Sequence, residues 1–509
     1  MRTRLFVTGI FISQTTLKTS DTQLRGISTL ISVDRRSRKP IYVQIYENFR
    51  TKIVRGELRA GQIVPSTREL ASELRVSRFP VLNAYAQLLA EGYFQSRAGA
   101  GTFIASSLAG KLRSRGRRTR RGPTREPRAI AAHASALPRY VKPFWHENLG
   151  PFQLGQPELE DFPLETWSKL VARHSRSMRV NELKYGDAMG SPALRVAIAT
   201  YLRTSRAVLC EPDQIMILNG SQQALDLTTR VLLDSGAPVW VEEPGYWLVH
   251  HVLKAAGCQA VPVSVDKEGL DVSAGIKLSP KARAAFVAPS HQFPLGVTMS
   301  AARRLQLLEW AQTAGSWIVE DDYDSEYRYE SMPISSLQGL DTNSCVIYVG
   351  TFSKVLFPSL RLGYIVIPPD LLERFAAVRQ SMDLCPSPSN QAVLTEFIRE
   401  GHFARHIRRM RQIYGERRRV LVKEIERELG SSCSIVGGEA GLHLTILIDG
   451  GIRDREIAAK AADKQLWLSA LSLSYAGDAK RQGFVLGFGN ARASDIPGAV
   501  RLLKKLLKA

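Results

Sequence analysis

The 509-residue sequence contains no uninterrupted apolar run of about 18 residues, so it offers no segment that could span a bilayer as a helix. A short apolar stretch after Arg4 is broken by Thr8 and Gly9, and no small-residue cleavage pattern follows it, which argues against a signal peptide. The five cysteines form no Cys-x-x-Cys pair. The lack of such a pair argues against a disulfide framework or a structural zinc site, and it favours a cytoplasmic protein with reduced thiols. Because no spanning segment is present, no membrane partner is expected.

Acidic residues are scarce in the first third of the chain. Residues 1–145 hold 8 Asp or Glu against 27 Lys or Arg, whereas residues 146–509 hold 40 against 42. Nearly all of the formal net charge of +21 therefore lies in the N-terminal segment. A basic segment joined to a near-neutral body is typical of a protein that binds a polyanion such as double-stranded DNA.

Composition and patterning divide the chain into four regions. Residues 1–33 show no period, and two interpretations stay open: a disordered N-terminal extension, or a start codon placed too early. Residues 34–106 form a compact helical unit, and residues 146–509 form a larger globular body. Residues 107–145 connect the two as a basic linker, expected to be disordered because nine Lys or Arg stand against one acid before residue 130.

The larger body alternates helical segments with short runs of apolar residues. This alternation predicts an α/β domain with a mostly parallel sheet that is covered by helices on both faces. The runs are Ile215–Leu218, Val239–Val241, Ala285–Ala288, Trp317–Val319, Val346–Val349 and Tyr364–Ile367.

Residues 34–106 predict three helices followed by a hairpin. Apolar residues recur every four positions from Ile41 to Ile53, as expected of an amphipathic first helix. Ser66 and Glu69 have the spacing of a capping box at the start of a second helix, and Ser77 can cap a third. Two short strands around Gly99-Ala100-Gly101 then complete a winged helix-turn-helix, an α+β unit. The residues of the third helix that are expected to face inward are Val81, Tyr85, Leu88 and Leu89.

In such a motif the first turn of the third helix meets the base edges of the major groove. Arg78 can form two hydrogen bonds with a guanine, and Asn83 can pair with an adenine. Arg68 begins the preceding helix, where a phosphate would be held. The predicted DNA-contact residues are Arg68, Ser77, Arg78, Asn83, Gly99, Gly101 and Thr102.

The elements P-S-x-R-E-L, V-S-R and G-x-G-T-F follow one another in this region. Over about 65 residues the sequence resembles the GntR-type winged-helix domain of bacterial repressors. One departure concerns Pro80, which stands where family members often carry a threonine whose hydroxyl reaches a phosphate. Proline cannot donate a hydrogen bond there, so this phosphate contact is not expected.

A second cluster of functional residue types is Thr351-Phe352-Ser353-Lys354, which follows an apolar run and precedes Arg361. A lysine in a desolvated, cationic setting can form a Schiff base with an aldehyde, and nearby hydroxyls and an arginine can hold a phosphate. Ser221 and Gln222 open a helix after another run, where free backbone N–H groups form an anion site.

Acidic and aromatic residues follow two further runs. A pyridine ring is an electron sink only while its nitrogen is protonated, which requires a buried carboxylate, and Asp321 is the candidate. Tyr323 can donate a hydrogen bond to the phenolate oxygen of such a ring, and Tyr246 can stack on its face. All of these residues follow strands, at the sheet edge where α/β proteins bind ligands.

Residues 146–509 resemble the fold-type I aminotransferase domain, whose cofactor is pyridoxal 5′-phosphate. The motifs that carry the resemblance begin at Tyr185 (YGDAMGSPALR), Ala288 (APSHQFPLG) and Gly350 (GTFSK). The resemblance implies that Lys354 is the Schiff-base lysine and that Tyr185 reaches the phosphate across a dimer. It implies a cofactor site of Lys354, Asp321, Tyr323, Tyr246, Ser221, Gln222, Thr351, Ser353, Arg361, Tyr185 and His291.

Two departures from the aminotransferase pattern concern the substrate. The Asn of Asn-Pro-x-Gly is replaced by Phe293, and the strand Phe484–Gly489 carries an apolar residue where an arginine usually holds the α-carboxylate. Arg481 and Arg492 stay open as substitutes. Because a substrate clamp supplies much of the positioning in a reaction, its loss argues against efficient turnover of α-amino acids. We therefore expect no enzyme, although weak or partial transamination stays open.

A winged helix joined by a basic linker to an aminotransferase-like body resembles the MocR subfamily of GntR regulators. The resemblance implies a head-to-tail homodimer that regulates transcription in response to a ligand, either a small amine or the cofactor itself. Two alternatives stay open: an aminotransferase that carries a DNA-binding domain, and a plain repressor whose large domain only dimerises. No metal site is expected, because His402 and His406 lack a third ligand.

Overall fold

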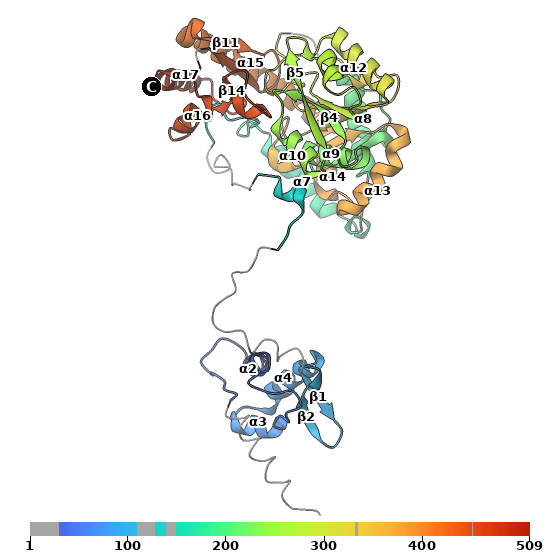
Figure 1. Cartoon of the computed structure of the whole chain (residues 1–509), viewed down its shortest axis with the longest axis vertical. Coiled ribbons are helices and arrows are strands. Elements are labelled where there is room, and N and C mark those ends of the chain that lie inside the picture. Colours follow the sequence, from blue (N-terminus) through green and yellow to red (C-terminus); the bar gives the residue numbers. More distant parts are fainter. Residues whose placement is uncertain (1–29, 109–127, 139–148, 331–333, 450, 509) are drawn as a thin grey trace, which may run out of the picture. The chain divides into compact units, whose positions relative to one another are not determined.

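The structure of the chain is a computed structural model, and it contains two compact units, an N-terminal unit (residues 1–129) and a C-terminal unit (residues 130–509) (Figure 1). It describes residues 30–108, 128–138, 149–330, 334–449 and 451–508. Most of the expected N-terminal extension and basic linker, namely residues 1–29, 109–127 and 139–148, lies outside the described residues. No helix in the described ranges is both long enough and apolar enough to cross a membrane.

The N-terminal unit is a winged helix-turn-helix, as the sequence predicts. Its two strands pair in an antiparallel hairpin. Its elements are α2 (Ile41–Arg55), α3 (Thr67–Glu73), α4 (Arg78–Ala90), β1 (Phe94–Arg97) and β2 (Gly101–Ile104).

The predicted capping box of α3 is present. The Ser66 hydroxyl accepts the backbone N–H of Glu69 at 3.3 Å, and the Glu69 carboxylate accepts the backbone N–H of Ser66 at 2.8 Å. Ser77 occupies the N-cap position of α4, but its side chain makes no capping hydrogen bond, so that part of the prediction is wrong. Leu89 was also placed wrongly. The buried face of α4 runs through Ala84 at helical spacing, which leaves Leu89 37% exposed beside that face.

Aromatic residues from three elements form the core of the N-terminal unit. The rings of Phe49, Tyr85 and Phe94 pack edge to face with centroid distances of 5.1–5.7 Å. Ile31 is buried in the same cluster. The folded unit therefore begins before residue 34, where the sequence pattern placed its start.

A large sheet of eight strands organises the C-terminal unit. The strand order is β3-β10-β9-β8-β7-β4-β5-β6. Five neighbouring strands are parallel: β9, β8, β7, β4 and β5. Strand β10 runs antiparallel to both of its neighbours, and β6 runs antiparallel to β5. The strand bounds are β3 Ile215–Leu218, β4 Pro238–Glu243, β5 Gln259–Asp266, β6 Gly269–Leu270, β7 Ala284–Val287, β8 Trp317–Asp322, β9 Val346–Thr351 and β10 Gly363–Val366.

Helices cover both faces of this sheet, which confirms the predicted α/β class (Figure 1). Alternate strand residues enter different cores: Ile365 packs with helices α9, α10 and α13, whereas Tyr364 packs with α7, α8, α14 and α15. A third core lies under α11 and α12. The helices are α6 (Ala132–Ser135), α7 (Leu164–Ser177), α8 (Pro192–Arg206), α9 (Ser221–Leu232), α10 (Trp247–Ala255), α11 (Val272–Leu278), α12 (Ala301–Ala314), α13 (Leu372–Asp383), α14 (Pro388–Arg399) and α15 (His402–Leu429).

A smaller antiparallel sheet follows α15, in the order β11-β12-β14-β13. The sequence pattern indicated only the strand that became β14. The elements are β11 (Cys433–Val436), β12 (His443–Ile448), α16 (Asp454–Ala462), β13 (Ser469–Ala470), β14 (Gly483–Gly487) and α17 (Ile496–Leu507).

Candidate functional site

Four neighbouring strands of the large sheet end at one edge and deliver most of the predicted site residues. Lys354 follows β9, and Asp321 is the penultimate residue of β8 with Tyr323 just beyond the strand. His291 follows β7, and Tyr246 follows β4. These strands are adjacent in the sheet order and parallel, so their carboxyl ends meet at the same place. The structure therefore brings together residues that are spread over more than a hundred positions of sequence.

Lys354 is held by the backbone of a distant segment. Its Nζ donates a hydrogen bond to the carbonyl oxygen of Gly155 at 2.8 Å. Burial lowers the pKa of the Lys354 ammonium, although the carboxylates of Asp324 and Asp321 act in the opposite direction. A lowered pKa increases the neutral fraction of the amine, the form that attacks an aldehyde.

The carboxylate of Asp321 is buried, and its environment suits a cationic ligand. Its Oδ1 atom is buried and makes no hydrogen bond in the part of the chain that the structure describes. Burial, together with the neighbouring Asp322 and Asp324, raises the pKa of Asp321 to about 7, although Lys354 acts to lower it. A protonated ring nitrogen placed against this carboxylate would stabilise its ionised form.

The predicted anion site lies at the start of α9. Gly220 has a φ of +95° and precedes the helix, whose first residue is Ser221. The guanidinium of Arg361 lies against this turn: it donates to the carbonyl oxygen of Asn219 at 2.6 Å, and a Cβ added to Gly220 would lie 3.1 Å from its Nη2. A cation beside free helical N–H groups is suited to a phosphate.

Hydroxyl and amide groups border the same region. The backbone N–H of Ser353 donates to the Thr351 hydroxyl at 3.2 Å, which fixes the turn after β9. Within the described ranges, the buried Ser353 Oγ and Gln222 Oε1 make no hydrogen bond. Unpartnered buried polar atoms are rare in folded proteins, so these groups indicate a ligand.

The two remaining aromatic residues of the predicted site differ in burial. Tyr246 is half-buried and packs edge to face on Phe293 at a centroid distance of 5.8 Å. Burial and the charge on Asp321 raise the pKa of its hydroxyl, whereas Arg361 lowers it. Tyr185 is 85% exposed, so the site within one protomer does not enclose it. Its role across a dimer stays a prediction.

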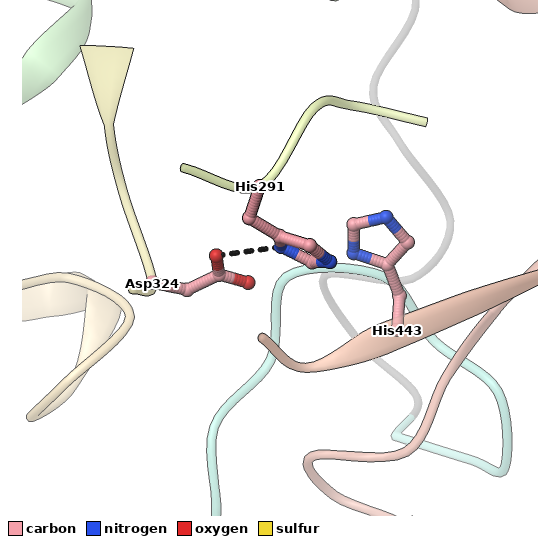
Figure 2. A group of neighbouring side chains, drawn as sticks. All are labelled: His291, Asp324 and His443. Atoms are coloured by element: carbon pink, nitrogen blue, oxygen red, sulfur yellow. Dashed lines mark hydrogen bonds and ion pairs between the residues drawn. The ribbon is translucent and has the colours of Figure 1, made fainter. Parts of the chain in front are cut away.

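His291, Asp324 and His443 form a buried group, of which the sequence predicted only His291 as a site residue (Figure 2). Its Nδ1 donates to Asp324 Oδ1 at 2.8 Å and lies 3.2 Å from the Tyr323 hydroxyl. His443, from β12, lies with its ring centroid 4.7 Å from that of His291. Burial and the adjacent His291 together lower the pKa of His443 to about 3, although Asp324 acts to raise it.

The same three side chains could offer ligand atoms to a metal ion. However, both oxygens of Asp324 already accept N–H groups, one from His291 and one from the Leu442 backbone at 3.0 Å. His443 Nε2 contacts the carbonyl oxygen of Pro294 at 3.2 Å. The group therefore functions as a hydrogen-bonded cluster, and the absence of a metal stays a prediction.

Sequence reasoning missed several residues of this site. Asp324 stands in the same acidic run as Asp321 and could have been found from that spacing. Glu242 precedes the turn of Tyr246; it accepts from Ala288 N and Gln292 Nε2, each at 3.3 Å, and burial raises its pKa to about 8. His443 carries no local signal, because only the packing of the smaller sheet brings it here.

The predicted DNA-contact residues lie on the surface of the N-terminal unit. Arg68, Ser77, Arg78, Asn83, Gly99 and Gly101 are exposed, and Thr102 is half-buried. The Nε atom of Arg78 donates to the Thr67 hydroxyl at 3.1 Å, which aims the guanidinium. Phe79, next along the helix, is 69% exposed.

Two family descriptions match the chain. "Bacterial regulatory proteins, gntR family" matches residues 41–104, and "Aminotransferase class I and II" matches residues 151–473. The probable rhizopine catabolism regulatory protein MocR of Rhizobium meliloti is 39% identical over 460 residues, which cover 90% of this chain and 92% of that protein. The chain belongs to the MocR-type regulators of the GntR family.

Other relatives of this MocR-type regulator include both regulators and enzymes. The pyridoxine biosynthesis transcriptional regulator PdxR of Corynebacterium glutamicum is 29% identical and covers 88% of this chain and 92% of its own. Among solved structures, the kynurenine aminotransferase of Pyrococcus horikoshii in complex with PMP has a TM-score of 0.68 and is 28% identical over 74% of this chain and 96% of its own. The fold alone therefore does not distinguish regulation from catalysis.

The aminotransferase family implies pyridoxal 5′-phosphate, and the residues present fit this group. The unpartnered Asp321 Oδ1 requires a cation such as a ring N–H⁺. The Ser353 hydroxyl, which has no partner among the described residues, and Arg361 beside the start of α9 suit an anion such as a phosphate. The amine of Lys354 lies among them and requires an aldehyde.

Proposed function

We propose that this MocR-type protein binds operator DNA through its N-terminal unit and senses an amine through pyridoxal 5′-phosphate held in its C-terminal unit. The observation that carries the proposal is the placement of the Lys354 amine near the unpartnered Asp321 carboxylate and the cationic Arg361. Together they match the reactive aldehyde, the ring nitrogen and the phosphate of one molecule.

When bound, the cofactor supplies an aldehyde carbon that an amine can attack. Lys354 contributes the resident amine, and burial keeps part of it neutral. Asp321 would hold a proton at the ring nitrogen, and Tyr246 would cover one face of the ring. The side chains proposed to bind the phosphate are those of Ser221, Gln222, Thr351, Ser353 and Arg361, with the partner's Tyr185.

On the DNA side, Arg78 is proposed to read a guanine, since its fork of donors matches the two acceptors of that base. Its contact with Thr67 fixes the side chain before DNA arrives. Arg68 is proposed to hold a phosphate, which adds affinity without sequence preference. The bound amine controls transcription only if it binds the DNA-competent and incompetent states with different affinity.

We propose that the protein is a sensor rather than an enzyme. Val485 of β14 stands where the related enzymes place an arginine for the α-carboxylate, and it is buried against Leu295 and Leu471. A carboxylate placed there would be desolvated without a partner. The second candidate, a true aminotransferase, is favoured by the complete Lys354–Asp321 pair and by the aromatic-amino-acid aminotransferase 1 of Thermococcus litoralis, which is 29% identical over 66% of this chain and 82% of its own.

We also propose a homodimer with a head-to-tail arrangement. Four apolar side chains within eight residues of sequence are strongly exposed in the single chain, which favours a covered interface. They are Met178 (44%), Val180 (76%), Leu183 (70%) and Tyr185 (85%).

The decisive experiment is an absorbance titration of the full chain with pyridoxal 5′-phosphate. We expect a new visible band in the wild type and none in Lys354→Ala. A wild type without such a band would overturn the cofactor site. Operator binding is then measured with and without the cofactor and candidate amines. Steady-state amino transfer at about 1 per second or faster would instead establish the enzyme.

A further inference from the structure

The hydroxyl of Tyr323 lies beside a nitrogen that already has a fixed task. His291 Nδ1 is 2.8 Å from Asp324 Oδ1 and 3.2 Å from the Tyr323 oxygen (Figure 2 shows the His291–Asp324 contact). Asp324 also accepts the backbone N–H of Leu442 through its second oxygen at 3.0 Å. Both carboxylate oxygens therefore act as acceptors, and the hydrogen between Asp324 and His291 belongs to His291 Nδ1.

This assignment determines what the tyrosine can do. A ring nitrogen that carries a hydrogen has no lone pair in the ring plane, so His291 Nδ1 cannot accept a hydrogen bond from Tyr323. The Tyr323 oxygen can only accept from it. The hydroxyl proton of Tyr323 is then free to be donated in another direction.

A loop of the smaller sheet holds the histidine–aspartate pair in place. Gly441 has a φ of +67°, and a Cβ added there would lie 2.1 Å from His291 Cε1 and 2.3 Å from Asp324 Oδ2. Leu442, the next residue, supplies the N–H to Asp324. The pair thus sits between the edge of the large sheet and the start of β12, with no space for a side chain at Gly441.

We infer that Asp324, His291 and the Gly441–Leu442 loop fix the direction of the Tyr323 hydroxyl, so that its proton points into the cofactor site. There it is donated to the phenolate oxygen of the bound ring. This inference rests on the proposed function. His291 and Asp324 act as positioning residues, since they act through Tyr323, and the smaller sheet is thereby linked to the electronic state of the cofactor.

Other ionisable groups face this cluster and set the background for any pH measurement. The charged groups that act on Tyr323 are Asp324, Asp321, Glu242 and Asp322. His443 faces His291 from β12, and its lowered pKa keeps it neutral near pH 7. The charges of Asp324, Asp321 and Arg361 all act on Lys354. A variant that leaves all of these charges in place is therefore the best probe.

The test is a pH titration of the visible band of the cofactor-loaded full chain. A hydrogen bond donated to the phenolate oxygen stabilises its negative charge and so weakens its attraction for the proton on the neighbouring nitrogen. Loss of that hydrogen bond therefore raises the pKa of this nitrogen, and with it the pH midpoint of the visible band. Tyr323→Phe is expected to raise it by about one unit, and His291→Leu by about half a unit to one unit. In the Tyr323→Phe background, His291→Leu is expected to add nothing.

Gly441→Ala provides a version of the test that keeps every titratable group. It displaces the pair and is expected to raise the midpoint in the same direction as His291→Leu. Gly451→Ala is the matched control, because Gly451 has a φ of +71° and no atom within 4 Å of an added Cβ. The control is expected to leave the midpoint unchanged while losing similar stability.

The outcomes separate the inference from the proposed function. A normal wild-type band whose midpoint is unaffected by both His291→Leu and Gly441→Ala overturns the inference alone. An equal shift by His291→Leu with and without the Tyr323 hydroxyl also overturns it, because the histidine would then act directly. Absence of any band in the wild type overturns the proposed function, and the inference with it. Equilibrium cofactor affinity, measured in parallel, identifies a variant that has merely lost the site.

Discussion

Gly155 is the residue whose replacement tests the cofactor site most directly. It has a φ of +68°, and an added Cβ would lie 2.4 Å from Lys354 Nζ. Carbon and nitrogen atoms in contact lie about 3.5 Å apart, so in Gly155→Ala the Lys354 amine must retreat by about 1 Å. This displacement breaks the 2.8 Å hydrogen bond to the Gly155 carbonyl oxygen and moves the amine away from the position where the aldehyde is expected.

The expected size follows from two separate effects. A non-glycine residue in the left-handed region costs about 1–2 kcal/mol, which lowers the free energy of unfolding. The same displacement moves the amine from the position where the aldehyde is expected, and a misfit of about 1.4 kcal/mol in the bound state lowers cofactor affinity about tenfold. Gly315→Ala separates the two, because Gly315 has a φ of +60° and open space around an added Cβ.

Both variants are compared in the full chain by chemical denaturation and by absorbance titration with pyridoxal 5′-phosphate. We expect a similar loss of stability in both and a loss of affinity in Gly155→Ala alone. Wild-type affinity in Gly155→Ala would refute the placement of Lys354 that the proposed function requires. Weakened affinity in Gly315→Ala as well would show that the effect is one of global stability.

Three further predictions concern the two units separately. Ser66→Ala removes half of the capping box of α3 and should lower the stability of the N-terminal unit by about 1 kcal/mol, measured by thermal unfolding. Arg78→Ala should weaken operator binding by about 1–3 kcal/mol and relax the base preference at one position, whereas Arg68→Ala should weaken binding to all sequences and reduce its salt dependence. In the C-terminal unit, burial alone would raise the pKa of Glu158, but the hydrogen bond from Arg417 and backbone N–H donors outweigh it and lower this pKa. The stabilisation is therefore present above the ordinary glutamate pKa of about 4.3 and is lost as the pH falls through the lowered value. Arg417→Met should destabilise strongly at pH 7 and progressively less as the pH falls through the lowered Glu158 pKa, and a loss of stability that does not change with pH would contradict this reasoning.

The sequence predicted where the proposed cofactor residues lie in the fold, because their positions depend on local order. Short apolar runs become parallel strands, and the residues that follow such strands meet at one sheet edge whatever the helices between them do. Asp321, Lys354 and the start of α9 could therefore be placed before any contact was known. The capping box at Ser66 is another local feature, since its two hydrogen bonds lie within four residues.

Features that depend on long-range packing escaped prediction. Gly155 and Lys354 are 199 positions apart, and no sequence pattern near Gly155 indicates that a lysine contacts it. His443 enters the site only because the smaller sheet packs against the loop that carries His291. Leu89 shows the same limit on a smaller scale: helical spacing allows it on the inner face, and the actual partners of α4 determine that Ala84 is buried there instead.

The positions at which the C-terminal unit departs from the aminotransferase pattern help to distinguish a sensor from an enzyme. The groups proposed to hold the cofactor are present, whereas Val485 is buried among apolar side chains where the resemblance to aminotransferases implies a cation for the substrate carboxylate. An enzyme depends on that cation, because a poorly anchored substrate loses much of the rate gained by positioning. A sensor depends on something else: its ligand must bind two states of the protein with different affinity, and a ratio of about 10⁴ suffices to reverse a 99:1 equilibrium. An amine can supply such a difference by exchange at the cofactor without a carboxylate clamp. A change that would disable a transaminase therefore leaves a regulator intact, provided that the cluster around His291 carries the exchange to the smaller sheet.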